Sequence, residues 1–232
     1  MKKIILLLSC LFVFSNINAQ TGPDEDQLGA WYMAFASLNF KDSKFGLQGD
    51  YQFRFWDAGG DLEQILLRTG VTYRPDNMNG LFTLGYGNIT TGQFGDSKET
   101  SSESRIYQEA LLPHKLTDRI QLTHRFRYEQ RFVEGQDFRT RYRYNLFMNI
   151  LLNNTKLEKN TFYIALYNEI FINGQREIGD ERTVQLFDRN RIYLGLGYGI
   201  TDKLRVQAGW MKQTTVNWAK GQMQLSLHKK FG

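Results

Sequence analysis

Cysteine, proline and histidine are all scarce in this chain. Its 232 residues include one cysteine, Cys10, three prolines and three histidines. Because Cys10 falls in the apolar N-terminal stretch, the remainder can form no intramolecular disulfide and offers no thiolate for metal binding or catalysis. The scarcity of proline permits long β-strands, since each proline removes a backbone donor from a sheet. Aromatic residues, at 14%, are plentiful by contrast, and they favour strands.

Long apolar runs are missing as well. Beyond residue 19 no segment approaches the roughly 20 consecutive apolar residues that a membrane-spanning helix needs, and the mean hydropathy is −0.46. The sequence therefore excludes a helical membrane protein. It does not exclude a membrane-spanning β-barrel, in which only alternate residues of each strand face lipid.

The N-terminus has the pattern of a secretory signal peptide. Lys2 and Lys3 precede an apolar core at residues 4–14, and Ile17-Asn18-Ala19 matches a cleavage site. Loss of the two lysines would lower the formal charge from +5 to +3. We therefore expect the mature protein to leave the cytoplasm.

The remainder, residues 20–232, shows no linker and is expected to form one domain, with residues 1–19 as the signal peptide. The motif Leu7-Leu8-Ser9-Cys10 also permits a lipoprotein interpretation. That interpretation is weaker, because apolar residues continue through Phe14 and the part before the cysteine would be a very short signal.

Two neighbouring segments, residues 120–132 and 138–150, alternate so strictly that each has an apolar face and an arginine-rich face. A period of two residues is β-strand geometry. Ordinary strands run about 5–6 residues, whereas a strand that crosses a bilayer at a tilt needs roughly 9–11. Arginine against lipid would cost roughly 2–4 kcal/mol at the midplane. We therefore expect the apolar face outside and the arginine face toward a lumen.

The same alternation in other segments extends the expected lumen lining. The candidate lumen residues are Arg54, Arg68, Arg125, Arg127, Glu129, Arg131, Arg139, Arg141, Arg143 and Arg191. A tip of three unpaired residues at 134–136, with Gly135 able to adopt a positive φ, fits the arginine-rich pair of strands. This register predicts three opposed pairs, namely Glu129 with Arg141, Arg127 with Arg143, and Arg131 with Arg139.

Positive charge exceeds negative charge on the expected lumen face. Glu129 alone cannot neutralise its arginine neighbours, and Glu109, Asp50 and Glu169 are candidate partners from other strands. Two interpretations of the lumen stay open. Side chains joined by salt bridges would fill it, as in other small barrels, or a ring of arginines would focus positive potential in a narrow pore for small anionic solutes.

The pattern as a whole predicts an all-β chain that forms an antiparallel up-and-down transmembrane β-barrel of about 12 strands, within a range of 10–12. Eleven segments alternate, but bacterial single-chain barrels have an even number of strands. We therefore favour a twelfth crossing, with two alternatives: one weak segment is no strand, or the first strand pairs irregularly with the last. Connections at residues 41–44, 75–80, 117–119, 153–160 and 201–203 would lie on one side, and loops around residues 59, 97, 135, 175 and 217 on the other.

Catalytic and metal sites are weakly indicated. Ser226 and His228 share a lumen face, but two residues along a strand are about 7 Å apart, which is too far for a nucleophile and its base. Residues 180–188 space their carboxylates too loosely for a calcium site. Gly85-Tyr86-Gly87 opens no helix, so it is no nucleotide loop. We predict no enzyme activity, no metal and no cofactor.

Aromatic residues near strand ends or on the apolar faces are expected to form interfacial girdles. These residues are Trp31, Trp56, Trp210, Tyr73, Tyr198 and Phe231.

Several motifs occur in an order that spans nearly the whole chain beyond the signal. They are Leu28-Gly29-Ala30-Trp31-Tyr32, Gly60-Asp61-Leu62-Glu63-Gln64, Arg68-Thr69-Gly70-Val71, Arg125-Phe126-Arg127-Tyr128-Glu129-Gln130-Arg131, Arg139-Thr140-Arg141-Tyr142-Arg143-Tyr144 and Phe187-Asp188-Arg189-Asn190-Arg191. In these motifs the chain resembles the bacterial family filed as domain of unknown function 2490. The resemblance implies an outer-membrane barrel of unassigned activity and supplies no catalytic residues.

The C-terminal residues 225–231 resemble the aromatic-terminated strand that barrel-assembly machinery recognises, although Gly232 after Phe231 departs from that pattern. We therefore expect an integral protein of the outer membrane that contacts its lipid, meets this machinery during insertion and binds no nucleic acid. Two alternatives remain. One is an outer-membrane enzyme acting on lipid or peptide, and the other is a soluble secreted barrel that binds a ligand inside an aromatic interior, with the arginines outside.

Overall fold

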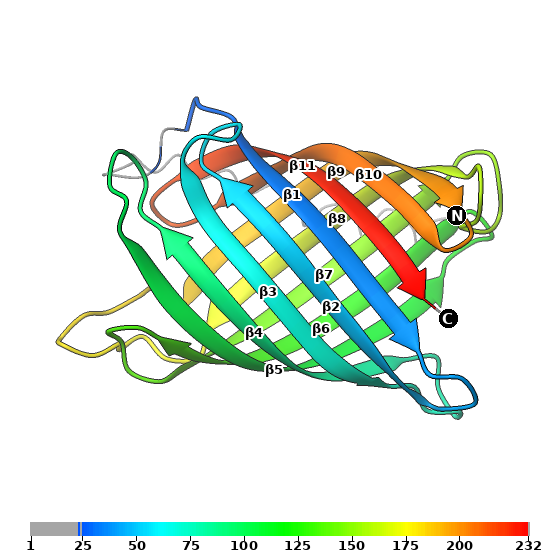
Figure 1. Ribbon diagram of the computed structural model, residues 1–232, viewed down its shortest axis with the longest axis horizontal. Helices are drawn as coiled ribbons and strands as arrows, with labels where there is room; N and C mark the ends of the chain where they lie inside the picture. Colours follow the sequence, from blue (N-terminus) through cyan, green and yellow to red (C-terminus); the bar gives the residue numbers. More distant parts are fainter. Residues whose placement is uncertain (1–22, 24, 232) are drawn as a thin grey trace, which may run out of the picture.

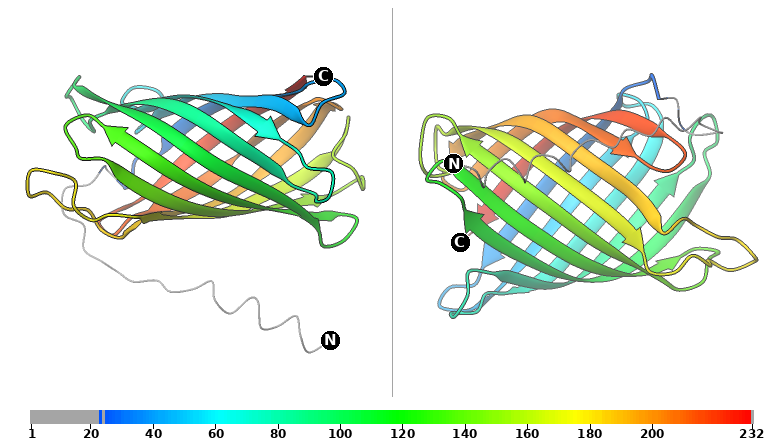
Figure 2. Two further views of the ribbon diagram at one scale, coloured as in Figure 1. Left: turned by 90° about the horizontal axis from the view of Figure 1, so that it is seen from below. Right: turned by 180° about the vertical axis from the view of Figure 1, so that it is seen from behind.

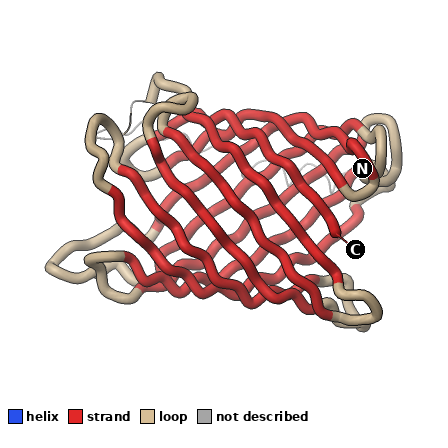
Figure 3. Tube along the Cα trace, in the orientation of Figure 1, coloured by secondary structure: helices blue, strands red, loops and turns tan. Residues whose placement is uncertain are grey.

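The computed structural model describes residue 23 and residues 25–231. The predicted signal peptide, Cys10 and Gly232 lie outside the described residues. The described chain consists of β-strands joined by loops and turns, without a helix (Figure 3). The strands are β1 (Gly29–Asn39), β2 (Phe45–Phe55), β3 (Leu62–Tyr73), β4 (Leu81–Gly92), β5 (Thr100–Lys115), β6 (Ile120–Val133), β7 (Arg139–Leu151), β8 (Phe162–Asn173), β9 (Phe187–Thr201), β10 (Leu204–Thr214) and β11 (Ala219–Phe231).

The eleven strands form one closed barrel. Strands adjacent in sequence pair antiparallel, and β1 and β11 close the ring in parallel, from Gly29 opposite Gln222 to Leu38 opposite Phe231 (Figure 1). The all-β barrel prediction is confirmed. The favoured twelfth crossing is not found among the described residues, because the first strand instead pairs irregularly with the last. An odd number of alternating strands makes the first and last run in the same direction.

The connections gather at two rims of the barrel (Figure 2). The long-loop rim carries residues 56–61, 93–99, 134–138, 174–186 and 215–218. The C-terminal rim carries residues 40–44, 74–80, 116–119, 152–161 and 202–203. The predicted division of turns between two sides is therefore confirmed. Because β1 and β11 are parallel, β1 begins at the long-loop rim whereas β11 ends at the opposite one.

The two faces of the barrel wall differ in chemistry as the alternation predicts. On the outer face, Phe126, Tyr142 and Leu194 are 49%, 54% and 56% exposed. On the inner face, Arg127 and Arg141 are 7% and 4% exposed. The polarity of apolar side chains outside and guanidinium groups inside is confirmed. No helix in the described part of the chain is long and apolar enough to span a membrane.

Glycines on the inner face make room for aromatic rings from neighbouring strands. A Cβ atom on Gly85 of β4 would lie 2.1 Å from Cζ of Tyr107, and one on Gly197 of β9 would lie 2.1 Å from Cζ of Tyr163. Both rings lie in the interior, where Tyr107 is 2% exposed and Tyr163 is fully buried. Large and small side chains therefore interdigitate between neighbouring strands on the inner face.

The interior of the barrel has an apolar region and a charged region. An apolar cluster comes from β1 and from β7 to β10, and consists of Trp31, Leu151, Tyr163, Ala165, Tyr193 and Met211. Most of the buried charged side chains lie instead on β2 to β8. These charged side chains form the network described next.

Candidate functional site in the barrel lumen

The β6–β7 hairpin supplies the largest group of lumen arginines. Its register pairs Glu129 with Arg141, Arg127 with Arg143 and Arg131 with Arg139, so the predicted register is confirmed. Gly135 at the tip has a φ of 66°, a left-handed conformation that glycine adopts without strain.

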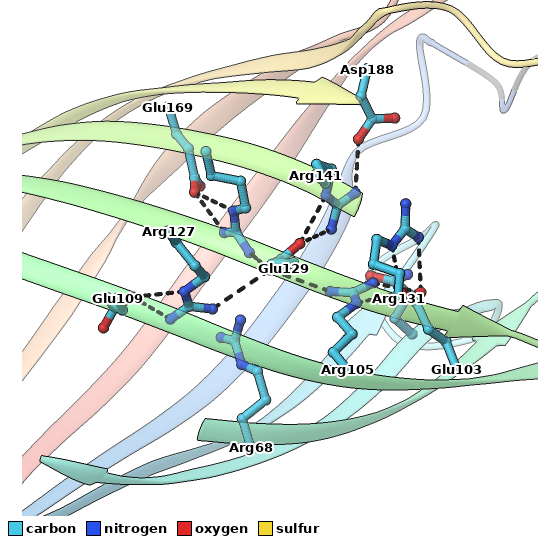
Figure 4. Close-up of polar contacts among 12 residues, drawn as sticks. Arg68, Glu103, Arg105, Glu109, Arg127, Glu129, Arg131, Arg141, Glu169 and Asp188 are labelled. Atoms are coloured by element: carbon cyan, nitrogen blue, oxygen red, sulfur yellow. Dashed lines mark hydrogen bonds and ion pairs between the residues drawn. The ribbon is translucent and has the colours of Figure 1, made fainter. Parts of the chain in front are cut away.

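Glu129 lies at the centre of the network and is 1% exposed (Figure 4). Its Oε2 accepts hydrogen bonds from Nε and Nη2 of Arg141, at 2.9 and 2.7 Å. Its Oε1 accepts one from Nη1 of Arg143 at 2.6 Å. Guanidinium nitrogens of Arg105 and Arg127 lie 4.0 and 3.9 Å from the same oxygen. One carboxylate therefore faces four guanidinium groups.

Three further carboxylates form ion pairs with lumen arginines, as the sequence predicts. Glu109 accepts a hydrogen bond from Nε of Arg127 at 2.7 Å, and Glu169 binds Nη2 of Arg143 at 2.6 Å. Asp50 binds Nη2 of Arg68 at 2.9 Å. Their expected role as ion-pair partners is confirmed. Glu169 also receives a hydrogen bond from Arg125 at 2.6 Å.

Two other carboxylates of the network were not anticipated. Glu103 accepts hydrogen bonds from both Arg105 and Arg131, at 2.5 to 2.9 Å. Asp188 binds Nη1 of Arg141 at 2.8 Å. Glu103 continues the inner-face alternation of β5, and that alternation in the sequence would have revealed it. Asp188 lies in β9, two strands along from β7, and only the curved barrel wall brings its carboxylate to Arg141.

Trp31 corrects the girdle prediction. It is 2% exposed inside the barrel, where its Nε1 donates a hydrogen bond to Glu63 at 2.7 Å. The guanidinium carbons of Arg54 and Arg191 lie 3.8 and 4.7 Å from its ring centroid, a cation–π arrangement. Glu63 reaches the interior because a register shift after Arg54 inserts an extra residue into β3. The sequence does not predict that Trp31 points inward, because small apolar residues occur on both faces of β1 and make its alternation ambiguous.

The other aromatic residues expected in girdles divide between the rim and the outer wall. Trp56 packs edge-on against Phe94 and Trp218 at the long-loop rim, with centroid distances of 6.0 and 5.9 Å. Trp210, Tyr73 and Phe231 are 45%, 38% and 51% exposed, and Tyr198 donates a hydrogen bond to Asn160 at 2.8 Å.

The structure places all ten candidate lumen residues on the inner face. Nine are between 1% and 8% exposed, and the side chain of Arg125 is 16% exposed. Among the described residues three of the ten have no carboxylate within ion-pair distance: Arg54, Arg139 and Arg191. Arg54 binds Gln52 and Gln64, and Arg191 binds Gln213. Buried arginines outnumber buried glutamates nine to five in the described chain, so positive charge is in excess.

Ser226 and His228 are closer than strand geometry alone suggests. The Oγ of Ser226 and Nε2 of His228 are 3.0 Å apart, so the predicted separation of about 7 Å is wrong for the side-chain atoms. The two side chains lean toward each other along β11, and the imidazole stacks on Phe35 with centroids 4.7 Å apart. No carboxylate in the described chain is hydrogen-bonded to His228, so the orienting group of a catalytic triad is not among its contacts.

The described residues contain no cluster of three or more histidine, cysteine, aspartate or glutamate side chains that could hold a metal ion.

The family model described as "Protein of unknown function (DUF2490)" matches residues 28–224. The chain belongs to this family. The match covers all of β1 to β10 and part of β11, and therefore includes the whole arginine and glutamate network. No curated protein matches the chain.

Proposed function

We propose that this protein of the DUF2490 family is an integral outer-membrane β-barrel whose lumen is closed by its own side chains. The observation that carries the proposal is the burial of polar groups inside the ring. Glu129 is 1% exposed, and Gln213 and Gln222 are fully buried, so water does not reach them. A barrel filled in this way acts as a structural element of the membrane rather than as a channel.

The outer wall supports the membrane location. Leu67, Leu84 and Leu196 are 58%, 60% and 65% exposed on the outer face, which would be unfavourable in water over so large an area. Strands of 11 to 16 residues exceed the roughly 9–11 that a bilayer crossing requires. Contact with outer-membrane lipid and insertion by barrel-assembly machinery belong to the same proposal, which includes no catalytic step and no nucleic-acid partner.

Planar-bilayer recording of the refolded protein tests the closed lumen. We expect no stable unitary current. A matched variant, W31A, removes the indole that lies between Arg54 and Arg191 and should raise the frequency of conducting events. Steady unitary currents from the wild-type protein would contradict a closed lumen.

A second candidate function, a narrow path for small anions, is favoured by the nine-to-five excess of buried arginine over buried glutamate. Its signature is a current whose reversal potential in a salt gradient shows anion selectivity. Cation selectivity would eliminate this candidate.

Fractionation tests the location independently of conductance. The protein should sediment with membranes and resist extraction by high salt or alkali. Recovery in the aqueous fraction without detergent would favour the soluble ligand-binding barrel, and activity toward labelled lipid or peptide would favour the enzyme.

A further inference from the structure

Among the described residues, positive charge accumulates at the C-terminal rim, where Arg74, Arg205 and Lys230 outnumber the one nearby carboxylate, that of Asp202. Arg205 of β10 lies directly opposite His228 of β11. Lys230 follows on the same inner face, and its backbone N–H binds the carbonyl of Lys203 at 2.8 Å. Arg205 and Arg74 both repel Lys230 electrostatically. In the described chain Arg74, Arg205 and Lys230 take part in no ion pair, whereas most arginines deeper in the lumen do.

The Arg205 guanidinium carries one of several buried donors in the described chain that lack a hydrogen-bond partner. Its Nε is buried and has no hydrogen-bond partner. The phenol of Tyr163 is a hydrogen-bond partner of this guanidinium, but an uncharged hydroxyl does not balance the charge. Buried donors in native proteins are almost always paired. The Nε of Arg205 can therefore still donate a hydrogen bond to an acceptor from outside the chain.

A small cavity lies at this point. Its volume is about 10 Å³, and it is lined by Arg205, His228 and Lys230 together with residues of the turn between β9 and β10. That is about the space of one water molecule or one oxygen atom. Asp202 also lines it, but one of its carboxylate oxygens already accepts a hydrogen bond from the backbone of Lys159 at 3.0 Å. The imidazole is fixed by Ser226 and by its stacking on Phe35.

We propose that this cluster of Arg205, His228, Lys203 and Lys230 is a binding site for the phosphoryl group of a water-soluble solute. One phosphoryl oxygen fills the cavity beside Nε of Arg205, and the others face the exposed ammonium groups of Lys203 and Lys230. A phosphoryl group carries about −1.5 to −2 charges and three strong acceptor oxygens, which suits several cations that converge from different strands. Because the cluster faces the interior, the ligand arrives through water at the rim rather than from a bilayer.

The test is a titration of the full-length refolded barrel with inorganic phosphate at constant ionic strength, followed by the ³¹P line width. We expect saturable broadening for the wild-type protein and a dissociation constant at least about tenfold higher in R205Q, the loss expected for a charge-assisted hydrogen bond. K230Q should show the same direction of change. Lys230 lies at the exposed end of β11, so K230Q should fold normally. It therefore tests the proposal even if R205Q does not fold.

The matched control is K229Q. Lys229 is adjacent in sequence but lies over Phe231, which is exposed on the outer face, so the affinity should stay at the wild-type value. An equal loss in K229Q and R205Q, or broadening that never saturates, would overturn the proposal by showing only diffuse attraction to a basic rim. Displacement of phosphate by an equal concentration of acetate would overturn the assignment to phosphoryl groups.

Discussion

Neutralising the central carboxylate with E129Q is the sharpest test of the lumen network. Glu129 is 1% exposed and accepts three hydrogen bonds from Arg141 and Arg143, at 2.6 to 2.9 Å. Glutamine keeps the shape of the side chain but removes its charge. Four guanidinium groups would then share an interior without their common counter-charge.

The expected loss is large because the burial is nearly complete. Removing one member of a buried ion pair typically costs about 3–5 kcal/mol, and Arg141 and Arg143 retain Asp188 and Glu169 as second partners. We therefore expect the free energy of unfolding to fall by about 3 kcal/mol, at the lower end of that range. Because a typical native state is stable by about 5–15 kcal/mol, the change is readily measurable.

Urea unfolding of the barrel in lipid vesicles, monitored by tryptophan fluorescence, provides the measurement. The matched control E177Q alters an exposed loop glutamate and should change stability by no more than about 0.5 kcal/mol. The double variant E129Q/R141Q should lose less than the sum of the two single variants, with a coupling of about 0.5–3 kcal/mol. An E129Q loss below about 1 kcal/mol, or strict additivity, would refute the claim that this carboxylate holds the network together.

Four further outcomes follow from the same structure. W31F should reduce stability by about 1–3 kcal/mol because Glu63 loses a donor 2.7 Å away, whereas W210F on the outer wall should shift the urea midpoint far less. G85A should destabilise the barrel by about 1–3 kcal/mol because the added Cβ would clash with Tyr107. The control is G59A, whose added Cβ meets nothing within 4 Å. Equal losses of stability in the two variants would contradict the interior packing. The backbone N–H groups of Asp61, Gly59 and Gly60 hold the pKa of Asp57 below its usual range, so its stabilisation of loop 56–61 is present above about pH 4 and lost as pH falls through the lower folded-state value. The protection factor of the Gly60 amide, which corrects for the pH dependence of intrinsic exchange, should fall on acidification in the wild type, while in D57A it should already be low at neutral pH. L28C, directly before β1, should react with an impermeant maleimide from the same side as S97C in the 93–99 loop, because both lie at the long-loop rim; reaction from opposite sides would contradict the antiparallel order of β1 to β4.

Local periodicity was sufficient to predict the wall of the barrel. The alternation in residues 120–150 indicated both strands, their inner faces and the register that opposes Glu129 to Arg141. It succeeded because a period of two residues is a property of neighbouring side chains, and because a one-residue slip would turn every arginine outward. The partners Glu109, Asp50 and Glu169 followed from the same rule.

Tertiary structure decided the features that depend on distant strands. The parallel pairing of β1 with β11, the inward turn of Trp31, the bulge that presents Glu63 and the 3.0 Å contact of Ser226 with His228 have no local signal strong enough to identify them. The sequence by itself determined which face of most strands is polar, because an arginine against lipid is unfavourable whichever strand carries it. The contacts of Arg125 with Glu169 and of Arg141 with Asp188 were decided only by the curved barrel wall, because in each pair a whole strand lies between the two residues.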